Sequence, residues 1–184
     1  MNLWQLPTEA NFSGVKYRHK SDYRQILRIF DILSDESRPE LYRWYLALVY
    51  FYEDPIPKTL EGEAMAYLSS FLTCGDGGRP GPKLLDWQTD APEIIADVNA
   101  VAGREIRAME YLHWWSFLSF FMAIGEGRLS ALVSIRDKLR RGKKLDPWEQ
   151  EYYRRDPQKL RLHPQPTVAD TAEKARLESL LAGN

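Results

Sequence analysis

The sequence contains one residue pair with the spacing of a metal site. Glu110 and His113 form a Glu-x-x-His pair, which on a helix places a carboxylate and an imidazole on one face. Di-iron helical bundles need two such pairs and two further glutamates, and the sequence has no second pair. The other histidines, His19 and His163, lie far from His113 along the chain. We therefore predict no metal site and interpret His113 as a helix-interior residue that makes one hydrogen bond.

Residue types suited to covalent catalysis are not arranged for it. Cys74, the single cysteine, is expected at the C-terminal end of a helix, where no positive dipole lowers a thiol pKa. There is no Gly-x-Ser-x-Gly elbow, and the glycine-rich residues 75–81 lack the Gly-Lys-Ser/Thr of a phosphate loop. We predict a flexible connection there, and a chain that is not an enzyme, without catalytic residue or cofactor. A single cysteine also excludes an internal disulfide and indicates a reducing compartment.

A basic segment is the main argument for nucleic acid. Residues 138–155 hold seven Lys and Arg against three Asp and Glu, and Trp148, Tyr152 and Tyr153 lie among them. Basic side chains bind phosphates, and aromatic rings stack on bases. However, the formal net charge of the chain is -1, and the sequence shows no motif that reads nucleic acid. A nucleic-acid-binding or regulatory role of this segment is therefore the alternative function, not the first.

Aromatic residues are more numerous than a small helical core usually needs. The chain has six Trp, ten Tyr and seven Phe. These rings either fill the core or anchor a partner, since Trp and Tyr are the commonest anchors of protein interfaces. Both interpretations stay open. The candidate partner-binding residues are Trp44, Tyr45, Trp114, Trp115, Trp148, Tyr152 and Tyr153.

The elements that carry these residues follow from hydrophobic spacing. Apolar residues recur at helical intervals along most of the chain. The helix expected at 106–124 is apolar on most sides and is placed at the centre of the core. Alternation of Val15, Tyr17 and His19 with basic residues predicts a short β-hairpin before the first helix. The predicted helices span about residues 21–33, 37–52, 59–74, 90–103, 106–124, 129–139 and 146–153.

Individual residues predict where several of these helices begin and end. Ser21 is expected to cap the first helix. Ser37, Asp90 and Asp146 are each followed by a glutamate three residues later, which is the spacing of a capping box. Gly75 is expected to end the third helix.

Together the patterns predict an all-α fold, a compact multi-helix bundle with the short hairpin at its N-terminus. Residues 1–160 are expected to form a single helical domain, and residues 161–184 a C-terminal tail with a short helix. The first residues lack the basic and long apolar regions of a signal peptide. The longest apolar stretch, residues 111–124, is too short to cross a bilayer as a helix. We expect a soluble cytosolic protein with no membrane partner.

Several segments of the chain resemble one known family. Three of them are residues 21–35, residues 48–57 and residues 110–118, and the Tyr-Leu-His-Trp-Trp run in the third is the most specific. Residues 133–136 and 151–154 continue the pattern in the same order. Over about residues 10–157 the chain resembles the bacteriophage gp-fifteen family of tailed phages and prophages of Gram-positive hosts.

The resemblance implies a role in phage tail assembly. Members of this family are encoded between the major tail protein and the tape measure protein, which is the position of tail assembly chaperones in long-tailed phages. Such a chaperone coats the hydrophobic tape measure protein until tail-tube subunits polymerise around it. The resemblance therefore implies a non-enzymatic protein of the bacterial host cytoplasm, with the tape measure protein as its partner. Coating a long partner needs many copies, so a homo-oligomer is expected.

Overall fold

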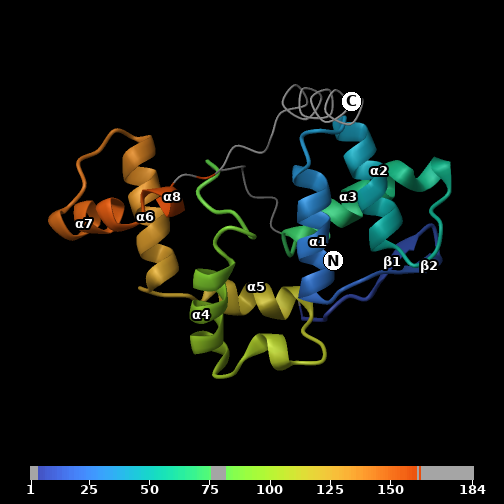
Figure 1. Cartoon of the computed structure of the whole chain (residues 1–184). Helices are drawn as coiled ribbons and strands as arrows, with labels where there is room; N and C mark the ends of the chain where they lie inside the picture. Colours follow the sequence, from blue (N-terminus) through green and yellow to red (C-terminus); the bar gives the residue numbers. More distant parts are fainter. Residues whose placement is uncertain (1–3, 76–81, 161, 163–184) are drawn as a thin grey trace, which may run out of the picture. The chain divides into compact units, whose positions relative to one another are not determined.

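Helices make up most of the residues that the structure describes, and a two-stranded hairpin lies near the N-terminus (Figure 1). The computed structural model describes residues 4–75, 82–160 and 162. These residues form two compact units that divide between residues 78 and 79, called here the first unit and the second unit. The predicted helical class and hairpin are confirmed. A single domain over residues 1–160 stays a prediction, and the helix predicted after residue 161 lies outside the described residues.

The hairpin begins the first unit. Strands β1 (Glu9–Phe12) and β2 (Val15–Arg18) pair antiparallel, with Phe12 opposite Val15. Ser13 and Gly14 connect them with positive φ angles of 52° and 87°. Two positive φ angles in succession are typical of the tight hairpin turn that matches the twist of its strands, and glycine adopts them at little cost. Alternation in the sequence therefore identified the second strand, and the turn determined its pairing.

The described part of the first unit also contains the helices α1 (Tyr23–Ser34), α2 (Glu40–Phe51) and α3 (Glu61–Leu72), the last preceded by the 3₁₀ turn η1 (Lys58–Leu60). The predicted cap of α1 is wrong by one residue, because Asp22, not Ser21, accepts the N–H of Arg24. The capping box predicted at Ser37 is also wrong. The Ser37 hydroxyl donates to Asp35 instead, and a proline occupies the cap position of α2.

The core of the first unit contains a cluster of aromatic rings. His19 is buried and lies parallel to Phe51, with ring centroids 4.4 Å apart. Its Nε2 is 3.0 Å from the Tyr67 hydroxyl, which donates to the Glu9 carbonyl over 3.1 Å. Burial, with Glu9 nearby, raises the pKa of Tyr67 to about 12, so this hydroxyl keeps its proton at neutral pH. These contacts join the hairpin to α2 and α3.

The second unit contains helices α4 (Ala91–Ala102), α5 (Trp114–Met122), α6 (Arg128–Arg140), α7 (Pro147–Arg155) and α8 (Pro157–Leu160), with a 3₁₀ turn η2 (Ile106–Ala108) after α4. Helix α4 packs against α5 and α6, and α6 packs against α8. The buried apolar residues of this unit include Ile94, Val98, Ile106, Leu112, Trp114, Trp115, Phe117, Leu129, Leu132, Ile135 and Leu160.

The continuous helix predicted over residues 106–124 is wrong. Its first part is the short turn η2, and residues 109–113 are not helical. The His113 Nδ1 accepts the N–H of Trp115 over 3.0 Å and so caps α5. A side chain that satisfies the first backbone donors of a helix fixes a start at that residue and competes with helix upstream. The sequence pattern did not reveal this break, because the non-helical residues Tyr111 and Leu112 are apolar, like the helix that follows them.

Two further predicted capping boxes have different outcomes. Asp146 and Glu149 form the predicted box at the start of α7, where the Glu149 carboxylate accepts the N–H of Asp146 over 2.7 Å. The box predicted at Asp90 is wrong, because Asp90 makes no side-chain cap bond. Its carboxylate binds Arg136 of α6 instead, over 2.6 and 2.8 Å. Tertiary contact has displaced the local bond.

A close approach between α4 and α6 depends on one glycine. The Asp97 carboxylate of α4 accepts the N–H of Leu129 over 2.9 Å, at the first turn of α6. A Cβ on Gly127 would lie 2.7 Å from the same Asp97 oxygen, closer than real contacts allow. The glycine therefore lets a carboxylate from a neighbouring helix reach the N–H groups of α6.

Candidate functional site

The Glu-x-x-His pair is not on one helix face. Glu110 and His113 both precede α5, and the predicted helix-interior position of His113 is wrong. His113 is buried and caps α5, whereas Glu110 is exposed. In the part of the chain that the structure describes, no group of three or more His, Cys, Asp or Glu side chains is placed to hold a metal ion. Absence of a metal site in the whole chain stays a prediction.

Cys74 lies just after α3, and its thiol is half-buried. Its backbone has a φ of 53°, and the N–H of the following Gly75 donates to the carbonyl of Ser70. Helix α3 therefore ends at Leu72, two residues before the predicted end, and Cys74 rather than Gly75 is the first residue with a left-handed conformation. Burial raises the pKa of the Cys74 thiol to about 11. At neutral pH only about one thiol in ten thousand is then a thiolate, the form that acts as a nucleophile. The rest of the glycine-rich segment, residues 76–81, lies outside the described residues.

Alkylation of Cys74 by iodoacetamide is expected to accelerate about tenfold per pH unit from pH 8 to pH 10, because the thiolate fraction rises tenfold per unit below the pKa. A peptide thiol of ordinary pKa, about 8.5, should level off above pH 9 in the same assay. Mass spectrometry gives both rates, and circular dichroism checks that the chain stays folded. A Cys74 rate that levels off near pH 9 would contradict the effect of burial.

Several basic side chains of the 138–155 segment form ion pairs with acidic side chains in or next to the same segment. Lys138 donates to Asp146 over 2.8 Å and to Glu149 over 2.7 Å, and these bonds hold its pKa above the usual value. Arg140 and Arg141 both pair with Asp137. The basic residues left exposed and without an ion pair to any described residue are Lys143, Lys144, Arg154 and Arg155.

The seven candidate partner-binding residues lie in three environments. Trp114 and Trp115 belong to the core of the second unit and are 0% and 5% exposed. Tyr152 and Tyr153 are half-buried against the cluster of Leu132, Ile135 and Leu160. The remaining three lie nearer the surface, with Trp44 half-buried and Tyr45 and Trp148 exposed by 49% and 54%. Partner binding stays a prediction for all seven, and only Tyr45 and Trp148 present large exposed surfaces for it.

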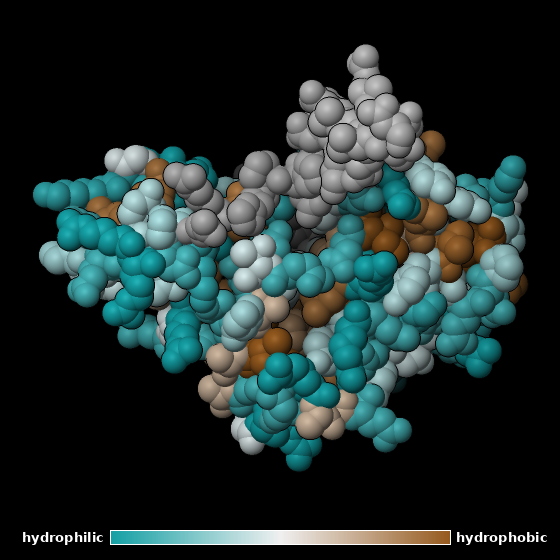
Figure 2. Space-filling model, viewed as in Figure 1, coloured by the Kyte–Doolittle hydropathy of each residue, from teal (hydrophilic) through white to brown (hydrophobic). Residues whose placement is uncertain are grey.

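An apolar stripe runs along the exposed side of α2. Leu41, Tyr42, Tyr45 and Val49 are 74%, 49%, 49% and 60% exposed, and their spacing places them on one side of the helix. The rings of Tyr42 and Tyr45 lie nearly parallel, with centroids 6.4 Å apart. We call these four residues the α2 stripe. Figure 2 shows hydrophobic side chains gathered over the α2 and α3 part of the first unit. Isolated exposed apolar residues need no explanation, but a contiguous stripe indicates a binding surface.

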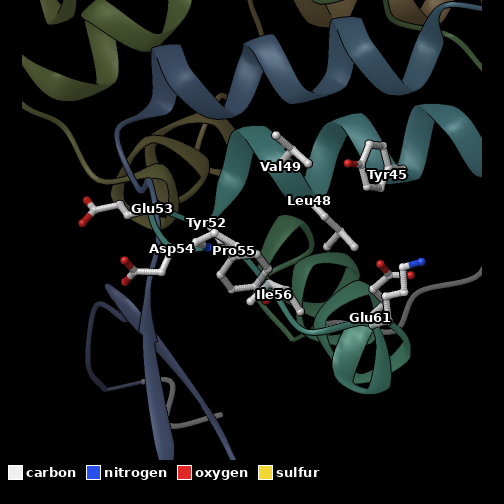
Figure 3. Close-up of a pocket in the computed structure, with 10 residues that line it drawn as sticks. Tyr45, Leu48, Val49, Tyr52, Glu53, Asp54, Pro55, Ile56 and Glu61 are labelled. Carbon is white, nitrogen blue, oxygen red and sulfur yellow. The ribbon is translucent and has the colours of Figure 1, made fainter.

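A groove of about 500 Å³ continues the α2 stripe between α2 and α3 (Figure 3). Its floor includes Leu48, which is buried, and Ile56, which is half-buried. Asp54 and Glu61 lie at its rim, and neither pairs with a basic side chain among the described residues. We call these four residues, with Tyr45 and Val49 of the stripe, the acidic groove. The volume falls within the range of about 300–1,000 Å³ that is typical of ligand pockets.

The sequence missed three members of this surface. Of the four stripe residues, only Tyr45 was among the candidate partner-binding residues, and Leu41, Tyr42 and Val49 were not. The available signal was that α2 carries apolar residues on more than one side. Such a helix has one face for the core and another for a partner, but periodicity alone does not say which is which.

No helix among the described residues is long and apolar enough to cross a membrane. Comparisons with protein-family models, with curated proteins and with solved structures find no match to this chain. The assignment of a function therefore depends on the surface and on the sequence patterns.

Proposed function

We propose that this chain is a non-enzymatic phage or prophage tail assembly chaperone that binds the tape measure protein during tail morphogenesis in the host cytoplasm. The observation that carries the proposal is the α2 stripe, four large apolar side chains exposed in a row on one helix. The sequence resemblance to the bacteriophage gp-fifteen family supports the same role. The tape measure protein is the partner that this role implies.

The chemistry of the stripe suits such a partner. A helical tape measure exposes apolar stripes before the tail tube encloses it. An exposed helix face can bind an apolar stripe through side chains at intervals of three and four residues. Aromatic anchors give substantial contact area with little loss of conformational freedom, and tyrosine keeps a polar hydroxyl in water when the surface is unoccupied. The α2 stripe therefore combines binding with solubility.

The proposal predicts that co-expression with the adjacent tape measure gene keeps the tape measure protein soluble. The variant Tyr45→Ala/Val49→Ala is expected to weaken the complex by about thirtyfold or more, since one interface anchor contributes about 2 kcal/mol. Pull-down and isothermal titration calorimetry measure the loss. The matched control is Val15→Ala/Met122→Ala, which truncates two other exposed apolar side chains.

Folding and binding are separated by circular dichroism, because the stripe is exposed and its truncation should leave the helical signal unchanged. A tape measure protein that is equally soluble with and without this chain would remove the chaperone function. Equal affinity of the stripe variant and the control would show that α2 is not the contact.

A nucleic-acid-binding or regulatory role is the second candidate. It is favoured by Lys143, Lys144, Arg154 and Arg155, which are exposed, lie within seven residues of Trp148 in the chain and have no ion pair to a described residue. Titration of labelled single-stranded or duplex DNA distinguishes the two roles, because phosphate contacts weaken steeply as salt rises. No binding at low salt would remove this candidate.

A further inference from the structure

Two exposed surfaces of this chain are complementary in charge and in apolar character. One is the acidic groove of the first unit, an apolar floor with Asp54 and Glu61 at its rim. The other is formed by Lys143, Lys144 and Trp148 at the start of α7, and we call it the Trp148 surface. Each presents what the other lacks, since one has a concave apolar floor and the other has a large exposed ring.

The acidic character of the groove extends along the chain that lines it. Residues 53–63 hold four Asp and Glu and one lysine, Lys58, which also lines the groove. Glu53 pairs with Arg18 over 3.1 Å, so this carboxylate is already partly neutralised. Asp54 and Glu61 remain, and Figure 3 shows the floor residues Leu48 and Ile56 between them. A basic side chain next to an apolar anchor is the chemistry that this arrangement recognises.

The Trp148 surface is shaped by the capping box of α7. Glu149 is buried, and both Glu149 and Asp146 bind Lys138, so these two acids are engaged within the segment, whereas Glu151 is exposed on the next turn of α7. Lys143 and Lys144 are exposed and have no ion pair to a described residue. Trp148 lies in the first turn of α7, where its ring is 54% exposed. Two exposed lysines therefore precede an exposed tryptophan by five and four residues along the chain.

We propose that the acidic groove of one copy binds the Trp148 surface of a second copy. The indole occupies the apolar floor, and the lysines face Asp54 and Glu61. Tryptophan is the commonest hot-spot residue of protein interfaces, and opposite charges steer and orient the encounter. The two surfaces are different, so two copies joined by one such contact still have one free groove and one free Trp148 surface. Further contacts at these surfaces either close the assembly into a ring or extend it as a filament.

The proposal is tested with two variants of the full chain. The groove variant is Asp54→Lys/Glu61→Lys, and its matched control is Glu36→Lys/Glu40→Lys, which also reverses one loop acid and the first residue of a helix. The second is Trp148→Ala/Lys143→Glu/Lys144→Glu, called the Trp148 variant, and its control is Met122→Ala, another exposed apolar residue. Circular dichroism and thermal melting confirm the fold of each.

Sedimentation velocity over a range of concentrations gives the result. The parent and both controls are expected to form larger species as concentration rises, and salt should weaken them. Each variant alone should associate about thirtyfold or more weakly. An equimolar mixture of the two variants should form a species of twice the chain mass and nothing larger, because one intact groove meets one intact Trp148 surface.

Three outcomes would overturn the proposal. They are a parent that stays monomeric at every concentration, assemblies that both variants leave unchanged, and a mixture of variants that remains monomeric. If one variant fails to fold, Trp148→Ala or Asp54→Lys alone provides the same test, since both side chains are exposed. The inference is independent of the tape measure. Normal self-association with no effect on tape measure solubility would remove the chaperone function alone.

Discussion

Replacement of Asp90 by alanine is expected to lower the free energy of unfolding of the second unit by about 3–5 kcal/mol, because it leaves a buried arginine without its counter-ion. The Asp90 and Arg136 side chains are 2% and 3% exposed. Arg136 also donates to the carbonyls of Leu84 and Lys159, and Asp90 accepts the N–H of Asp86. The pair thus joins α6 to the segment before α4 and to α8. Urea denaturation measures the loss.

Controls separate the buried charge from other effects. The double variant Asp90→Leu/Arg136→Met removes both charges and should regain most of the stability, since an unpaired buried charge costs more than the loss of a pair. Asp137→Ala removes the acid from the exposed pairs with Arg140 and Arg141 and should change stability little. Unfolding of Asp90→Ala at the same urea concentration as the parent would show that the pair contributes nothing.

Truncation of Trp114 to alanine is expected to destabilise the second unit by about 3–5 kcal/mol, the usual range for a large buried ring. Trp114 is 0% exposed. It lies nearly parallel to Phe117 with ring centroids 5.5 Å apart, and it makes a T-shaped contact with Trp87 with ring centroids 5.9 Å apart. The substitution therefore leaves a cavity in an aromatic cluster. The midpoint of urea or thermal unfolding gives the change.

The matched control is Trp148→Ala, which removes the same ring from an exposed position and should leave stability nearly unchanged. Trp114→Phe keeps an aromatic ring and should recover part of the loss. The effects on binding are expected in the opposite order. Among folded variants, Trp148→Ala should weaken self-association, whereas substitution of Trp114 should not, because Trp114 does not contact the second copy in the proposed interface. Equal destabilisation by Trp114→Ala and Trp148→Ala would contradict the burial that the structure assigns.

The two proposed contacts share Tyr45 and Val49, which belong to both the α2 stripe and the acidic groove. A tape measure segment on the stripe and a second copy in the groove would therefore compete for these two side chains. Variants at Asp54 and Glu61 act on the groove alone, and variants at Leu41 and Tyr42 act on the stripe alone. Comparison of the two sets separates chaperone binding from self-association.

Local interactions made much of the fold predictable from the sequence. The hairpin follows from alternation in β2, and the start of α7 follows from the box between Asp146 and Glu149, three residues apart. The end of α3 at Leu72, where the N–H of Gly75 donates to the carbonyl of Ser70, is equally local. In each case the deciding hydrogen bonds join residues within a few positions, so composition and spacing contain the information.

The tertiary structure decided the remaining features, because their partners are distant in sequence or their faces are equivalent in pattern. Asp90 has capping-box spacing, yet Arg136, 46 residues away, takes its carboxylate. Trp114 and Trp148 are the same residue type in helical segments, and only packing makes one core and the other surface. Helix α2 likewise has apolar residues on more than one side, so its sequence did not determine which face packs against the core. Burial of one face against the core of the first unit left Leu41, Tyr42, Tyr45 and Val49 outside, which is the surface that carries the proposed function.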